Sequence, residues 1–75
     1  MGNKPFQTLR DGAVKVSIWK NDGEQGPFFT ADLTKSYKDG QGRWQDTRSL
    51  SETDILKAAH LLGNAYELIK AERAQ

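Results

Sequence analysis

The sequence contains no cysteine, one histidine and two prolines among its 75 residues. Without cysteine the chain can form neither a disulfide nor a thiolate metal site, and one histidine excludes a multi-histidine metal centre. A chain of this length buries only about 60% of the surface that its unfolded form exposes, so its core is small. Because these usual supports are missing, we predict one small domain, residues 1–75, that gains stability as a homodimer.

Neither sign of charge dominates, because 11 Lys and Arg residues against 10 Asp and Glu residues leave a formal net charge of +1. Any attraction to a polyanion must therefore come from where the charges lie. No apolar run approaches the roughly 18 residues of a membrane span, and residues 1–5 lack the apolar segment of a signal peptide. We expect a cytoplasmic protein with no membrane partner.

Groups that could support catalysis are also scarce. His60 is the only side chain that titrates near neutrality when unperturbed, and helical spacing places it beside Lys57, Asn64 and Glu67, away from the apolar positions. No nucleophile with a base, no carboxylate pair and no metal cluster is evident, and the glycines suit hairpin turns rather than a phosphate-binding loop. The sequence predicts a protein that is not an enzyme, with no cofactor and no metal.

The first two thirds of the chain has the pattern of short β-strands separated by polar turns. Residues 13–20 alternate strictly, which predicts a strand with Val14, Val16 and Ile18 on its core face. Residues 5–10 form a candidate first strand before an Asp-Gly turn. We expect disorder only at about residues 1–4.

Two further strands are expected between this pattern and the helix. The polar segment 21–27 carries two glycines and a proline, so it predicts a loop or a wide hairpin connection. A strand then begins at Phe28, with its parity beyond Thr34 left open by the possibility of a bulge. The last strand, residues 43–50, is expected to be partly exposed or at an edge, because it carries poor core residues such as Arg48.

The C-terminal segment, about residues 52–73, predicts a single amphipathic helix. Ser51 is its expected N-cap, and acidic residues follow in the first turn. Gly63 interrupts the pattern and predicts either a kink or a close backbone contact. The apolar positions expected to face the sheet are Ile55, Ala59, Leu62, Tyr66 and Ile69.

Further apolar residues widen this stripe beyond the area that one small sheet covers. They are Ala58, Leu61, Ala65 and Leu68, and they favour a homodimer formed through the C-terminal helix. The fold class predicted from all these elements is α+β: a twisted antiparallel sheet of three to four strands followed by one C-terminal helix, in the order ββββα.

Aromatic and basic side chains are concentrated in the strand region. A basic side chain attracts the phosphate chain of a nucleic acid, and an exposed ring stacks an unpaired base for roughly 1–3 kcal/mol. Burial of Trp19, Phe28 and Trp44 in the core or in a dimer interface is an equally open interpretation. The candidate nucleic-acid-binding residues are Lys15, Trp19, Lys20, Phe28, Lys35, Tyr37, Lys38, Arg43 and Trp44.

Residues 33–44, LTKSYKDGQGRW, followed by the segment 48–51, RSLS, and the helix, resemble the single-stranded-DNA-binding domain of the transcriptional coactivator positive cofactor four. The Whirly and Pur-alpha groups are more distantly similar. The common pattern is a strand ending in a basic and aromatic segment, a short acidic and glycine turn, a last basic and aromatic strand, and a serine-capped helix. The order of elements matches along nearly the whole chain.

This resemblance implies a homodimer whose helices pack across a two-fold axis and whose curved sheets present aromatic and basic side chains to unpaired nucleotides. The residues that it implies at that surface are Lys15, Trp19, Lys35, Tyr37, Lys38, Arg43, Trp44 and Arg48.

Two functions remain open from the sequence. One is a non-enzymatic, dimeric protein that binds single-stranded DNA or RNA with low sequence specificity. The alternative is a protein-interaction or regulatory module that binds a partner at a sheet edge or in a helix groove, with the same aromatic residues as anchors.

Overall fold

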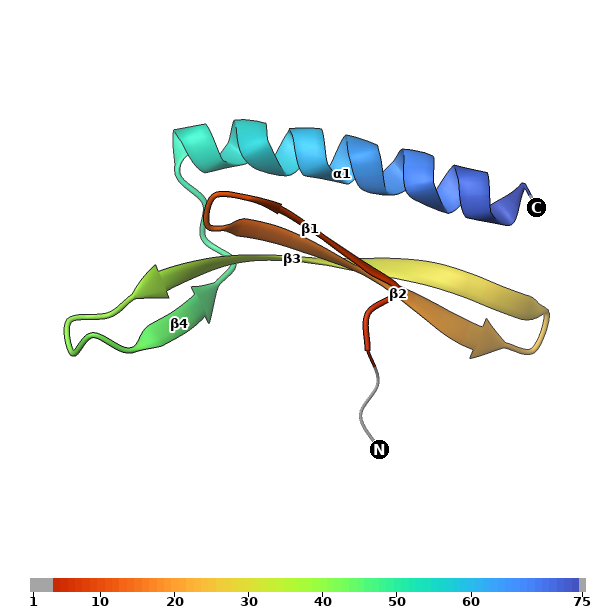
Figure 1. Cartoon of the computed structure of the whole chain (residues 1–75), viewed down its shortest axis with the longest axis horizontal. Coiled ribbons are helices and arrows are strands. Elements are labelled where there is room, and N and C mark those ends of the chain that lie inside the picture. The colour runs from red at the N-terminus through yellow and green to blue at the C-terminus, as the bar shows by residue number, and fades with distance from the viewer. Residues whose placement is uncertain (1–3, 75) are drawn as a thin grey trace.

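Four antiparallel strands precede one long helix in the computed structural model, which describes residues 4–74 (Figure 1). The sheet has the order β1-β2-β3-β4, so each strand pairs with its neighbour in sequence. This arrangement confirms the α+β, ββββα fold class. Most of the segment predicted to be disordered lies outside the described residues. The elements are β1 (Gln7–Asp11), β2 (Val14–Gly23), β3 (Gly26–Lys38), β4 (Trp44–Thr47) and α1 (Glu52–Arg73).

The connection between β2 and β3 differs from the predicted loop over residues 21–27. The two strands continue to pair until Gly23 lies opposite Gly26, and only two residues form the turn. Gly26 has a φ of 114°, which a residue with a side chain rarely adopts, and the ring of Phe28 packs against Gly23. The prediction of a wide connection is therefore wrong, because glycine at both ends permits a tight reversal.

The strand β3 keeps its alternation to its end. Its register with β4 runs without interruption from Lys35 opposite Thr47 to Lys38 opposite Trp44, so no bulge resets the parity. The strand β4 lies at the sheet edge, as expected, but it is shorter than the predicted strand 43–50. The chain leaves the sheet after Thr47, whose hydroxyl accepts a hydrogen bond from the Ser49 backbone N–H.

The core lies between α1 and one face of the sheet. Val14, Val16 and Ile18 of β2 are 0% exposed, which confirms the predicted core face of this strand. On the helix, the buried apolar residues are Ala58, Leu61 and Ala65. The helix packs on β1, β2 and β3 but not on β4, so the β3–β4 turn projects beyond it (Figure 1).

The side of α1 that faces the sheet differs from the predicted one. Ile55, Leu62 and Tyr66 are 56%, 41% and 62% exposed, whereas Ala58 and Leu61 are buried. The buried side is therefore displaced from the predicted stripe by about one residue, or about 100° around the helix. Small alanine side chains on the buried side allow the helix to approach the sheet closely.

A polar cluster fixes the start of α1 on the sheet. Ser51 and Asp54 form a capping box, in which each side chain accepts a hydrogen bond from the other residue's backbone N–H. The Lys35 ammonium of β3 donates a hydrogen bond to the same Asp54 carboxylate at 2.5 Å. Lys35 and then Ser51 lower the pKa of Asp54 from 3.8 to about 2. This cluster explains the displacement, since it turns Asp54 toward the sheet.

The helix is continuous through Gly63. A Cβ atom added at this glycine would meet nothing within 4 Å, so the expected close backbone contact is wrong. Within the described residues, no helix combines the length and the apolar character that crossing a membrane requires.

Candidate nucleic-acid interface

The sheet face opposite α1 is the candidate interface, and we call it the open face. Residues 4–74 place no helix or strand over it (Figure 1). Strand registers assign alternate residues of each strand to this face. They are Thr8, Arg10, Lys15, Ser17, Trp19, Asn21, Phe28, Thr30, Asp32, Thr34, Ser36, Lys38, Trp44 and Asp46.

Positive charge on the open face is concentrated near the end of the β1–β2 hairpin. Arg10 of β1 lies directly opposite Lys15 of β2. Like charges in this cross-strand position repel each other and destabilise the sheet. Among the described residues neither side chain has a salt-bridge partner. A bound polyanion would relieve this repulsion, so the pair favours an anionic ligand.

Aromatic rings lie at both ends of the open face. Trp44 is 69% exposed, and the Lys38 ammonium lies 5.5 Å from the centre of its ring. Phe28 is also exposed, near the β2–β3 turn. The strand rise places these two rings roughly 33 Å apart along β3. Trp19 lies between them and is only partly exposed.

The indole of Trp19 carries an unsatisfied donor. Its Nε1 atom is buried and has no hydrogen-bond partner among the described residues. Trp19 is therefore partly buried in the fold, whereas most of the Trp44 side chain is exposed. The sequence left both interpretations open for these two rings, and their different exposures now separate them.

Half of the sequence-predicted site residues come together on the open face: Lys15, Trp19, Phe28, Lys38 and Trp44.

The other five predicted site residues lie elsewhere. Lys35 and Tyr37 have the parity of the helix side, and Lys35 is engaged by Asp54. Lys20 also has helix-side parity, with its ammonium 6.0 Å from the centre of the Phe29 ring. The last two lie outside the strands: Arg43, in the β3–β4 turn, and Arg48, which is exposed after β4.

The β3–β4 turn is organised by Asp39. Its carboxylate accepts hydrogen bonds from the backbone N–H groups of Gln41 and Arg43. These bonds lower the pKa of Asp39, with the Arg43 N–H as the largest cause. The Arg43 guanidinium lies 3.6 Å from the same carboxylate, so the positive charge of Arg43 is partly neutralised.

Arg10 is the open-face residue that sequence reasoning missed. The Asp-Gly turn after it fixes the hairpin register and so places Arg10 opposite Lys15. The alternation of β2 already assigned Lys15 to the polar face, so extending the register across this turn would have found Arg10. Its assignment adds a guanidinium to the candidate interface.

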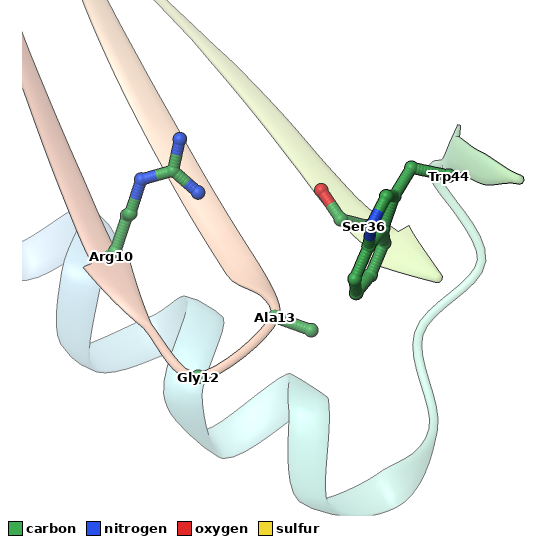
Figure 2. Close-up of a pocket in the computed structure, with 5 residues that line it drawn as sticks. All are labelled: Arg10, Gly12, Ala13, Ser36 and Trp44. Carbon is green, nitrogen blue, oxygen red and sulfur yellow. The ribbon is translucent and has the colours of Figure 1, made fainter. Parts of the chain in front are cut away.

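A pocket of about 380 Å³ lies at the corner of the open face (Figure 2). The pocket forms where β2 begins. Beyond this point β3 continues to Lys38, paired with β4 alone. Just before β2, the Ala13 carbonyl accepts a hydrogen bond from the Ser36 N–H of β3. We call this cavity the corner pocket. Its lining residues are Arg10, Gly12, Ala13, Ser36 and Trp44.

Within residues 4–74, no group of three or more His, Asp or Glu side chains is placed to bind a metal ion. His60 is exposed on the helix, and its Nε2 atom lies 3.3 Å from the Asn64 amide nitrogen.

In comparisons with known proteins, no protein-family model, no curated protein and no solved structure matches the chain.

Proposed function

We propose that this chain is a non-enzymatic, dimeric protein that binds single-stranded DNA or RNA with low sequence specificity. The observation that carries the proposal is the open face, where Arg10 and Lys15, which form no salt bridge within residues 4–74, lie on the same surface as the exposed rings of Phe28 and Trp44. Phosphates would contact the cations, and unpaired bases would stack on the rings.

A single strand fits this surface better than a duplex does. A ring stacks only on a base that is already unpaired, and duplex DNA encloses its bases. The cations are few, and Asp32 and Asp46 share the open face with them. Modest affinity with a clear salt dependence therefore follows from the proposal.

Dimerisation is the second part of the proposal, and it rests on the exposed side of α1. Four neighbouring apolar residues on this side, which we call the helix stripe, are exposed: Ile55, Ala59, Leu62 and Tyr66. A second copy of the chain would bury this stripe against its own and leave both open faces accessible. An apolar patch of this kind typically marks an interaction surface.

The binding prediction compares one cation on the open face with one away from it. Lys15→Gln is expected to weaken binding of a short oligothymidylate and to lower the salt slope of log K by about 0.7, the value for one phosphate contact to a single strand. Arg73→Gln removes a charge at the far end of α1 and is expected to leave both unchanged. Fluorescence titrations over a salt series measure both quantities. Equal behaviour of the two variants, or no binding by the wild type at low salt, refutes the proposal.

The dimer prediction compares two exposed leucines of α1. Leu62→Glu places a charge in the helix stripe and is expected to convert the dimer to a monomer, because an unpaired charge is costly to bury. Leu56→Glu, on another side of the helix, is the matched control and is expected to remain dimeric. Sedimentation equilibrium measures the mass of each. A monomeric wild-type protein at high concentration contradicts this part of the proposal.

A protein-interaction module remains the second candidate function, favoured by a different pocket. Between the end of α1 and the β2–β3 hairpin lies a cavity of about 390 Å³, lined by Lys20, Pro27, Phe29, Glu72 and Arg73. Its two basic residues outnumber the single acidic one, Glu72, and basic and apolar groups together suit an acidic peptide. Recovery of a stoichiometric protein partner after nuclease treatment would support this candidate, and loss of that partner in Lys20→Glu would locate it.

A further inference from the structure

The corner pocket places two kinds of recognition group across from each other. The Arg10 guanidinium and the Trp44 indole lie on opposite sides of it, with Ala13 between them (Figure 2). They come from strands at the two edges of the sheet. The pocket exists because β2 begins only at Val14, so Tyr37 and Lys38 of β3 pair with β4 but have no β2 residue on their other side.

One wall of the pocket is suited to stacking. Trp44 lines the pocket, whereas Lys38, whose ammonium lies over the Trp44 ring, does not. The cation therefore occupies a part of the indole surface outside the pocket and leaves the part inside it free. A planar ring entering the pocket would stack on the indole. The nearby Lys38 charge would also attract the phosphates of the bound nucleic-acid strand.

The opposite wall offers hydrogen-bond donors in a fixed arrangement. A guanidinium presents a planar fork of N–H groups that binds two acceptors side by side. Among the described residues Arg10 has no salt bridge and no side-chain hydrogen bond, so its donors are free. Lys15 opposite it adds positive charge and no acceptor.

Phosphate fits the pocket poorly despite this charge. The Ser36 hydroxyl, which lines the pocket, donates its hydrogen bond to the Asp46 carboxylate at 3.1 Å. That carboxylate would repel a phosphate group placed beside Ser36. A flat neutral ligand with two adjacent acceptors avoids the repulsion and still satisfies the guanidinium.

We propose that the corner pocket binds one unpaired guanine base of the nucleic acid, stacked on Trp44, with Arg10 donating to its O6 and N7 atoms. The proposal rests on the proposed function and deepens it, since it adds one base-selective position to a surface that otherwise ignores sequence. Guanine alone among the bases offers two adjacent acceptors on that edge, and an arginine fork is the usual partner for them. Adenine presents a donor at the corresponding position, and the pyrimidines offer no such pair.

The test uses short oligothymidylate strands that carry one central guanine, adenine, cytosine or thymine. Wild-type protein is expected to bind the guanine strand about 10-fold more tightly than the other three. Arg10→Lys keeps the charge but removes the fork, so the guanine preference is expected to disappear while affinity for the all-thymine strand changes little. Arg43→Lys, the same substitution in the β3–β4 turn, is the matched control and is expected to keep the preference.

The outcomes separate the two proposals. Equal affinity of the wild type for all four strands, or a guanine preference that survives Arg10→Lys, overturns the guanine site and leaves general single-strand binding intact. Failure of the wild type to bind any strand removes the proposed function and the guanine site together. Because Arg10 is exposed, Arg10→Lys is expected to stay folded, which its circular dichroism spectrum verifies.

Discussion

Replacing Leu61 by alanine is expected to lower the free energy of unfolding by about 2–4 kcal/mol, because the leucine is 4% exposed and packs in the only core found in residues 4–74. Deleting its buried methyl groups costs both their transfer free energy and the cavity left behind. A chain of this size is stabilised by only roughly 4–11 kcal/mol in total, so the variant loses a large part of its stability.

The matched control for this experiment is the neighbouring residue, Leu62. Leu62→Ala removes the same atoms from a side chain that is exposed in the single chain, so its direct cost is expected to stay below about 1 kcal/mol. Urea unfolding at several protein concentrations measures both variants. If the helix stripe is a dimer interface, the effect of Leu62→Ala depends on protein concentration and that of Leu61→Ala does not. A larger loss from Leu62 than from Leu61 at low concentration contradicts the observed packing of α1.

This pair of leucines also shows what the sequence could and could not predict about the helix. Its existence and its ends follow from local signals, since Ser51 caps it and the helix runs from Glu52 to Arg73 as predicted. Its rotation does not follow, because apolar residues cover more than half of its circumference and large ones, such as Leu61 and Leu62, lie on both the buried and the exposed side. The rotation is fixed by Lys35 and Asp54, which are 19 positions apart in sequence.

The full length of the β2–β3 hairpin was missed for a related reason, although a wide hairpin connection was one of the predicted possibilities. Alternation reveals a strand only where one face is buried and the other is wet. Near the turn the hairpin extends past the core, and Asp22 and Glu24 meet solvent there, so the sequence pattern is that of a loop. The two glycines that permit a tight turn are evident in the sequence, but the pairing of Gly23 with Gly26 is not.

At the candidate site, the predicted side of the sheet is correct where the alternation of apolar and polar residues is strict. Lys15 and Trp19 lie on the face opposite the core as predicted, since β2 alternates from its first residue. Lys35 and Tyr37 lie on the other side, because β3 keeps one parity over 13 residues. Composition had grouped these four residues by chemical type, and only the register separates them into two surfaces.

Stability is expected to fall in acid through Asp54. The pKa of its carboxyl is about 2 in the folded protein against 3.8 for the unperturbed group, because the Lys35 ammonium and the Ser51 groups stabilise the charged form. A lowered folded-state pKa means that the unfolded chain binds the proton more readily. The contribution is therefore complete above about pH 4 and is lost as the pH falls from about 4 to about 2.

Asp54→Asn tests this linkage, because an amide cannot titrate and cannot pair with the Lys35 charge. The variant is expected to be less stable than the wild type at neutral pH and to approach it as the pH falls to about 2, where the wild type has also lost the contribution of this carboxylate. Asp32→Asn, which removes an exposed carboxylate from the open face, is the control and is expected to retain the acid-sensitive loss. Urea unfolding between pH 2 and pH 7 measures all three proteins. A constant difference between Asp54→Asn and the wild type across this range would mean that the cluster at the start of α1 acts through its geometry and not through its charge.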